Sequence, residues 1–207
     1  MIVGSRGSKL AVLQAEMVIE RLKRCHCREF VIKTIKTTGD RQHQADLAEI
    51  GGQGLFVKEL ELALSNREVD LAVHSLKDVP TQLGQGLTLA AILEREDVRD
   101  VLVSKSGQGL ARLPRGARLG TGSQRRAVQI KAFRPDLVIR SIRGNIDTRL
   151  KKAFSDELDG VILAGAALAR LGWQDRITEY LPADLSLPMV GQGALAVEVR
   201  ADDDDTR

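Results

Sequence analysis

Three groups of polar side chains directly follow short apolar runs, and their residue types favour the binding of an anion. The first group is Ser75, Lys77 and Asp78, after the run 71–74. The other groups are Thr121, Ser123, Arg125 and Arg126 after the run 117–120, and Arg143 with Arg149 after the run 137–140. Hydroxyl, ammonium and guanidinium groups all donate hydrogen bonds to carboxylates and phosphates. Alone, each group is weak evidence for a ligand site, because a Gly/Ser turn before a helix is more often an ordinary helix cap.

The turn from Gly120 to Ser123, ahead of an expected helix, is the strongest of the three candidates. Glycine-containing turns expose backbone N–H groups, and the positive end of the helix dipole favours an anion before any side chain is counted. Arg125 and Arg126 add two guanidinium groups to the same turn. The sequence therefore predicts a cradle for a carboxylate or phosphate at this point.

An excess of arginine also indicates an anionic ligand. Arginine supplies 21 of the 31 basic residues, and its planar group suits two-point contacts with carboxylates. The formal net charge is +3, but four aspartates, Asp202 to Asp205, lie at the C-terminal end. Without them, 31 basic residues face 24 acidic ones, a balance of +7. The rest of the chain is thus distinctly basic.

Several other classes of protein fit the sequence poorly. Aromatic residues make up only 3% of the chain, which leaves few side chains to stack on nucleic-acid bases. No apolar run approaches the roughly 18 residues of a membrane-spanning helix, and Met1 begins no signal-peptide core. Cys25 and Cys27 are too few for a disulfide framework or a four-ligand zinc site. We expect a cytoplasmic monomer that binds a small molecule, with no metal, nucleic-acid or membrane partner.

Short apolar runs alternate with amphipathic stretches along the 207 residues, which predicts α/β layers with mostly parallel sheets. Strands are expected at 2–4, 30–35, 71–74, 87–93, 101–103, 117–120, 137–140, 161–164 and 194–200. Helices are expected at 10–22, with Ser8 as the N-cap, and at 55–64, 123–133, 145–154 and 166–171, and a long polar loop at 38–54. The polar stretch 94–97 is where the chain could cross between domains. The three polar groups would then lie at the carboxyl ends of strands, where open parallel sheets bind their ligands.

Several motifs closely resemble those of the porphobilinogen deaminase (hydroxymethylbilane synthase) family. Residues 69–81, VDLAVHSLKDVPT, are similar to the signature loop of that family. Further similar motifs follow in the family's order: GSRGS at 4–8, GLFVKELE at 54–61, RSIRGN at 140–145, TRL at 148–150 and VGQGA at 190–194. The resemblance runs from Ile2 to about Arg200.

This resemblance implies two periplasmic-binding-protein-like (type II) domains, with mixed, mostly parallel sheets, around a central cleft. We place the first domain at 1–95 plus 190–207 and the second at 96–189. The implied reaction is stepwise deamination and head-to-tail condensation of four porphobilinogen molecules onto a dipyrromethane cofactor. Each pyrrole carries an acetate and a propionate, so each added ring brings two more anions. A basic cleft is what such a product requires.

The resemblance also assigns roles to residues. Asp78, which by its position alone is typical of a turn before Val79 and Pro80, is implied to be the catalytic carboxylate. Its fixed negative charge would stabilise the cation left when ammonia departs. The implied set that binds cofactor and substrate carboxylates is Arg6, Ser8, Ser75, Lys77, Thr121, Ser123, Arg125, Arg126, Arg143, Arg149, Arg170, Gln192 and Gly193.

The sequence departs from the family pattern in a few places. Gly122 and Gln124 stand where the family commonly has serine and leucine, Lys9 where proline is common, and Gln53 where lysine is frequent. The family's third domain, with the cysteine that anchors dipyrromethane, has no counterpart here, so we expect a fragment that turns over poorly alone. The alternative is a non-catalytic binding protein for small carboxylates with the same two-lobed fold, which would have no use for the Lys77–Asp78 pair.

Overall fold

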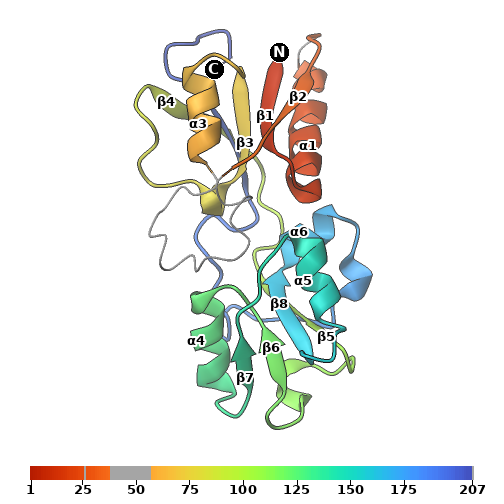
Figure 1. The fold of residues 1–207 in the computed structure, drawn as a ribbon. Coiled ribbons are helices and arrows are strands. Elements are labelled where there is room, and N and C mark those ends of the chain that lie inside the picture. Colours follow the sequence, from red (N-terminus) through yellow and green to blue (C-terminus); the bar gives the residue numbers. More distant parts are fainter. Residues whose placement is uncertain (26, 38–56, 207) are drawn as a thin grey trace. The chain divides into compact units, whose positions relative to one another are not determined.

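The computed structural model describes residues 1–25, 27–37 and 57–206, and within it the chain forms two compact units (Figure 1). The first comprises Met1–Arg95 and Ala194–Arg207, and the second comprises Glu96–Gly193. The chain thus leaves the first unit once and returns to it once. The sequence-based prediction put the return at residue 190, whereas the division lies at Ala194. The predicted loop 38–54 lies outside the described residues.

The first unit is a mixed five-stranded sheet. Its strands are β1 (Ile2–Arg6), β2 (Val31–Ile35), β3 (Leu71–Ser75), β4 (Leu87–Ile92) and β10 (Leu195–Arg200). They lie in the order β2-β1-β3-β10-β4. β1 pairs in parallel with β2 and β3, whereas β10 runs antiparallel to β3 and β4. The carboxyl ends of β1 and β3 therefore meet at one edge of the sheet.

Helices α1 (Lys9–Cys25) and α3 (Lys58–Ser65) cover opposite faces of this sheet. On one face, Ala15 and Val18 of α1 pack against Val3, Val73 and Val197. On the other, α3 packs its buried residues Leu60, Ala63 and Leu64 against Val69 and Ala72. Neighbouring strand residues point to opposite faces, so a strand buried on both sides is mostly apolar, and the buried exceptions in β3 and β10 are His74, Glu198 and Arg200. β3 and β10 accordingly lie in the middle of the unit.

The second unit repeats this arrangement. Its strands are β5 (Asp100–Ser104), β6 (Arg118–Gly120), β7 (Val138–Arg140), β8 (Gly160–Ala164) and β9 (Glu179–Tyr180), in the order β7-β6-β8-β5-β9. β6 pairs in parallel with β7 and β8, and β5 runs antiparallel to β8 and β9. In both sheets, the single reversed strand is the one that the chain enters after crossing between units. The expected mixed, mostly parallel sheets are confirmed.

The helices of the second unit are α4 (Gln124–Phe133), α5 (Ile146–Lys152) and α6 (Gly165–Arg170). Ile130 of α4 packs on one face of the sheet with Leu102, Leu119 and Ile162. Leu168 of α6 packs on the other face with the neighbouring strand residues. No helix among the described residues is both long and apolar enough to cross a bilayer.

Candidate functional site

The predicted residues of the first unit lie at the carboxyl ends of β1 and β3. Arg6 is the last residue of β1, and Ser8 caps α1, since its Oγ accepts a hydrogen bond from the Ala11 backbone N–H (3.3 Å). Ser75 ends β3, where its Oγ accepts a hydrogen bond from Nε2 of Gln14 (3.3 Å). Because β1 and β3 are parallel neighbours, these side chains share one sheet edge.

Lys77 and Asp78 stand on a single 3₁₀ turn, Leu76–Asp78, that follows β3 directly. The sequence indicated a turn in the loop that follows this strand, and a backbone hydrogen bond from Val79 N to Leu76 O closes a turn here. The Asp78 side chain is exposed and forms no hydrogen bond or ion pair within the described part of the chain. A carboxylate at a strand end without a partner of its own is available to a ligand.

The predicted cradle of the second unit lies between β6 and α4. Thr121 is buried, and its Oγ1 accepts a hydrogen bond from the Ser123 N–H (3.2 Å). Ser123 is the N-cap of α4, with its Oγ accepting from the Arg126 N–H (3.4 Å). Capping leaves the side chains of Arg125 and Arg126 in the first turn of the helix. That end of a helix carries partial positive charge, which disfavours two cations unless an anion is present.

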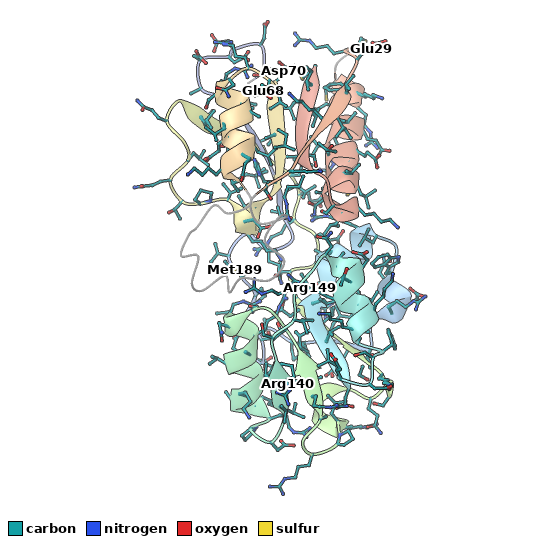
Figure 2. All side chains as sticks on the ribbon, viewed as in Figure 1. Glu29, Glu68, Asp70, Arg140, Arg149 and Met189 are labelled. Carbon is teal, nitrogen blue, oxygen red and sulfur yellow. The ribbon has the colours of Figure 1, made fainter. Side chains whose placement is uncertain are left out.

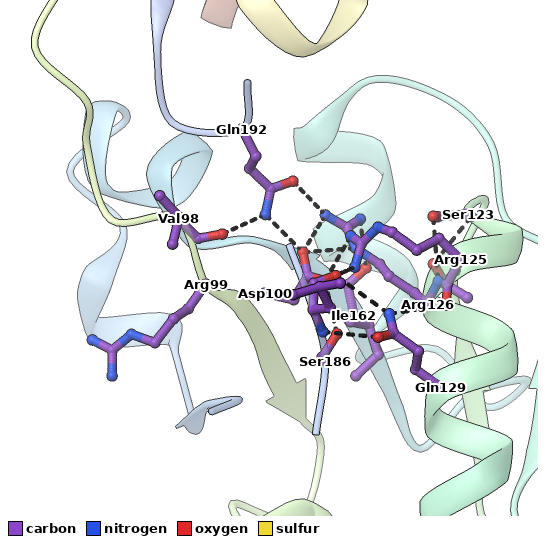
Figure 3. Close-up of polar contacts among 12 residues, drawn as sticks. Val98, Arg99, Asp100, Ser123, Arg125, Arg126, Gln129, Ile162, Ser186 and Gln192 are labelled. Carbon is purple, nitrogen blue, oxygen red and sulfur yellow. Dashed lines mark hydrogen bonds and ion pairs between the residues drawn. The ribbon is translucent and has the colours of Figure 1, made fainter. Parts of the chain in front are cut away.

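The anion beside these arginines is Asp100, the first residue of β5, which is fully buried (Figure 3). Its Oδ1 accepts hydrogen bonds from Arg126 Nε (2.9 Å) and Nη2 (2.7 Å) and from Gln192 Nε2 (2.9 Å). Its Oδ2 accepts from Arg125 Nη2 (2.7 Å) and Ser186 Oγ (2.9 Å). Burial alone raises the pKa of the Asp100 carboxyl. The charge and hydrogen bonds of Arg126, with those of Gln192 and Arg125, outweigh burial, so this pKa lies below its usual value.

Three of the predicted ligand-binding residues contact Asp100, a residue of the chain itself. Arg126 is 6% exposed, and its guanidinium group forms an ion pair with Asp100 rather than with a ligand. Gln192 is 1% exposed and also donates to the Val98 carbonyl oxygen (2.7 Å). Arg125 is more open and donates from Nη1 to the Leu187 carbonyl oxygen, while its buried Nε has no partner in the described structure. The structure thus brings Ser123, Arg125, Arg126 and Gln192 together around Asp100.

Arg170, at the end of α6, carries a second, partly buried guanidinium in this unit. Its Nη2 donates to the Gly193 carbonyl oxygen (2.5 Å), and its Nε has no partner in the described part of the chain. Burial lowers the pKa of Arg170 from its usual value, while the charge of Glu96 opposes the shift. An unpaired, desolvated cation of this kind gains most from a bound anion.

Arg143 and Arg149 lie after β7, within and beyond the turn that leads to α5. Nε of Arg149, whose side chain is labelled in Figure 2, donates to the Gly144 carbonyl oxygen (2.7 Å). This hydrogen bond fixes the α5 side chain against the preceding turn. Gly144 has a φ of 105°, a conformation that favours glycine. Thr121 N donates to the Arg140 carbonyl oxygen (3.0 Å), so this segment adjoins the cradle.

Sequence reasoning missed Asp100 and Ser186. Asp100 lies three residues after the polar stretch 94–97 that was interpreted as a crossing between domains, and nothing in its neighbours indicates a buried carboxylate. Ser186 lies in a segment between β9 and β10 for which no element was predicted, and it is fully buried. The sequence feature that could have indicated a buried carboxylate is the pair Arg125 and Arg126, because two adjacent guanidinium groups at a helix N-terminus require a counter-charge.

Comparison with known proteins places these residues in a family. The family model described as "Porphobilinogen deaminase, dipyromethane cofactor binding domain" matches residues 1–207. A porphobilinogen deaminase of Geobacillus kaustophilus is 53% identical over 209 residues, covering 100% of this chain and 68% of that protein. One from Geobacillus sp. strain WCH70 is 54% identical, covering 100% of this chain and 67% of that protein. The chain therefore spans about two thirds of the length of these relatives.

The fold is shared with solute-binding proteins. A periplasmic substrate-binding protein of an ABC transporter from Coxiella burnetii superposes with a TM-score of 0.54, over 98% of this chain and 86% of that one. Its sequence identity is 14%, so this likeness concerns the fold alone. It confirms the prediction of two type II periplasmic-binding-protein-like units.

Proposed function

This chain belongs to the porphobilinogen deaminase family, and we propose that Asp78 is its catalytic carboxylate and that the strand-end cations of its two units bind pyrrole carboxylates. The family's activity is that of a transferase, hydroxymethylbilane synthase. It deaminates four porphobilinogen molecules and joins them head to tail onto a dipyrromethane primer. The expectations of a monomeric cytoplasmic enzyme without nucleic-acid or membrane partners stay predictions.

The observation that carries the proposal for Asp78 is its exposed carboxylate, which has no partner among the described residues. When ammonia leaves porphobilinogen, the substrate carbon that carried it becomes electron-poor and the pyrrole ring shares the positive charge. A carboxylate fixed beside the pyrrole N–H stabilises that charge as it develops. An aspartate already committed to an ion pair would have less to offer, so the absence of an internal partner supports this role.

The cations around the second unit's cradle fit the carboxylates of dipyrromethane and of the growing product. Buried Nε–H groups of Arg125 and Arg170 have no partner in the described structure, and each can donate to a carboxylate oxygen. Charge-assisted hydrogen bonds of this kind contribute roughly 1.5 to 3 kcal/mol each. Dipyrromethane, when bound, supplies the free pyrrole position to which the first substrate is joined. The protein's own part is to hold the acetate and propionate groups in place.

Replacing the carboxylate by its amide tests the role of Asp78. Asp78→Asn should lower condensation by at least a hundredfold while leaving the thermal midpoint and substrate affinity close to those of the unmodified enzyme. The assay is uroporphyrin formed, after oxidation, by enzyme loaded with dipyrromethane. Asp202→Asn, which alters an exposed carboxylate in the same unit, is the matched control and should keep full activity. Near-normal turnover by Asp78→Asn would refute the assignment.

Calorimetry distinguishes the proposed enzyme from a non-catalytic receptor for small carboxylates. The proposal expects porphobilinogen to bind at least tenfold more tightly than simple dicarboxylates such as succinate. The reverse preference would support the receptor.

A further inference from the structure

We infer that Asp100 is a positioning residue, which, together with Arg126, holds the guanidinium group of Arg125 in the orientation that receives a ligand carboxylate. The inference rests on the proposed function, because it assumes that Arg125 binds a pyrrole carboxylate. It adds a residue that neither the sequence motifs nor the matched family description singles out. Figure 3 shows the five hydrogen bonds that converge on this carboxylate.

The first step concerns which donors Asp100 occupies. Arg126 has five N–H donors, and two of its nitrogens, Nε and Nη2, donate to Oδ1 of Asp100. Its Nη2 also lies 3.3 Å from Gln192 Oε1, and its Nη1 donates to the Ile162 carbonyl oxygen (3.4 Å). Nearly all of its capacity is therefore used within the unit. Arg126 serves mainly to support the charge and geometry of its neighbour.

Arg125 is held differently. Nη2 donates to Asp100 Oδ2, and Nη1 donates to the Leu187 carbonyl oxygen. These two contacts fix the plane of the guanidinium and leave its Nε–H unpaired. A side chain with this many rotatable bonds loses rotamer entropy when it is ordered. Asp100 orders the Arg125 side chain when the protein folds. A ligand carboxylate therefore binds without the entropy cost of ordering that side chain.

The second step concerns charge. Two guanidinium groups and the N-terminal end of α4 place positive charge in one turn, and one buried carboxylate offsets only part of it. The cluster of Asp100, Arg125 and Arg126 keeps a net charge of about +1, which is enough to attract a further carboxylate. Without Asp100 the two cations would repel each other and turn toward water. The site would keep its charge but lose its geometry.

The third step concerns rigidity. Asp100 is the first residue of β5 and is fully buried, and Ser186 and Gln192 donate to it from the segment that leads back toward β10. Gln129 of α4 adds two bonds to the same segment, from Nε2 to the Leu187 carbonyl oxygen (3.4 Å) and from the Leu187 N–H to Oε1 (2.8 Å). The Asp100 carboxylate thus connects α4, β5 and the returning segment. These three segments together restrict the motion of Arg125 and Arg126.

The test compares porphobilinogen with its dimethyl ester, whose carboxylates are masked, by calorimetry on this chain. The unmodified protein should prefer the free acid by at least tenfold. Asp100→Asn should reduce that preference to about twofold or less, and Asp100→Glu should keep an intermediate preference because it restores the charge one methylene further out. A merely structural defect would weaken the acid and the ester alike, so the ratio of the two affinities isolates positioning.

Asp136→Asn is the matched control, because Arg134 and Asp136 form a two-point ion pair at the opposite end of the same helix. It should leave the ratio unchanged. A folded Asp100→Asn variant with a full preference for the acid would overturn the inference. If that variant fails to fold, Ser186→Ala, which removes one hydrogen bond to Oδ2, should still lower the ratio a few-fold, and an unchanged ratio would overturn the inference. Absence of any preference in the unmodified protein would instead overturn the proposed function.

Discussion

Arg170 is the residue whose surroundings most resemble those of a ligand contact. Its guanidinium is partly buried, its Nε has no partner in the described structure, and its pKa is lowered by burial. The charge of Glu96 therefore offsets only part of the cost of desolvating this cation, since burial still lowers its pKa. A bound carboxylate is the simplest compensation.

Replacing Arg170 by glutamine should weaken porphobilinogen binding by roughly tenfold to a hundredfold, the value of one charge-assisted hydrogen bond. The same change should raise the thermal midpoint or leave it unaltered, since it removes an uncompensated buried charge. Arg176→Gln is the control, because Arg176 is exposed and already pairs with Asp175. Calorimetry and thermal unfolding measure the two effects. A loss of stability without a loss of affinity would contradict the ligand role.

The residue types in the sequence predicted well which polar groups lie at strand ends. They predicted poorly which of these groups keep hydrogen-bond donors that a ligand could use. Arg125 and Arg126 are adjacent and chemically equal in the sequence, yet one keeps an unpaired Nε–H and the other is enclosed by Asp100 and Gln192. That difference depends on Asp100, which lies 25 residues from Arg125 along the chain. Contacts of this range depend on the sheet topology, which side-chain chemistry alone does not reveal.

Helix α4 is the element on which the second unit's cradle depends, and its first turn is held by the Ser123 cap. Ser123→Ala removes the oxygen that accepts from the Arg126 N–H and should cost about 0.5 to 2 kcal/mol of unfolding free energy. Frayed first-turn residues would also hold Arg125 and Arg126 less firmly, so affinity for porphobilinogen should fall several-fold.

Urea unfolding and calorimetry measure the two effects of Ser123→Ala. Gln124→Ala, at the exposed next position, is the control and should change neither quantity appreciably. Equal stability of the Ser123→Ala and Gln124→Ala variants would mean that the cap contributes nothing.

Elements with a continuous apolar run or a clear helical period were predictable. β5 and β8 are buried at every position, and their sequences read as unbroken apolar runs apart from their polar or small ends. Ser8 was the expected cap of its helix and accepts the capping hydrogen bond, whereas Ser123, expected as the first residue of a helix, is the cap of α4. β9 was missed because it has only two residues, Glu179 and Tyr180, too few to show any period. The turn at Asp78 was expected from its position before Val79 and Pro80, and it takes the form of a single 3₁₀ turn.

The two units differ in how many of their carboxyls are stabilised in the ionised form. Among the described residues, four carboxyls of the second unit have a lowered pKa: Asp97, Asp100, Asp136 and Asp159. In the first unit two do, Glu68 and Asp203. The pKa of Asp136 falls from 3.8 to about 2, chiefly through its hydrogen bonds from Arg134. The second unit thus relies more on ionised carboxylates.

A carboxyl whose pKa is lower in the folded chain than in the unfolded chain stabilises the fold when it is ionised. This contribution to the free energy of unfolding is complete above the unfolded pKa, near 3.8 for an aspartate. It is lost as the pH falls through the folded pKa, which for Asp136 is about 2. Below pH 4 the second unit should therefore lose stability faster than the first. If the units unfold separately, the second should unfold at the higher pH.

The chain contains a direct reporter for this order. Its single tryptophan, Trp173, and its single tyrosine, Tyr180, both lie in the second unit, whereas helices of both units contribute to far-ultraviolet circular dichroism. During acid titration from pH 5 to pH 2, tryptophan fluorescence should change first, while a fraction of the helical signal persists to lower pH. Glu68→Gln, in the first unit, should leave the fluorescence midpoint in place, whereas Asp136→Asn should make the fluorescence-detected stability less dependent on pH. Coincident transitions would show that the units unfold together, and an earlier loss of helical signal would show that the second unit's ion pairs do not determine acid stability.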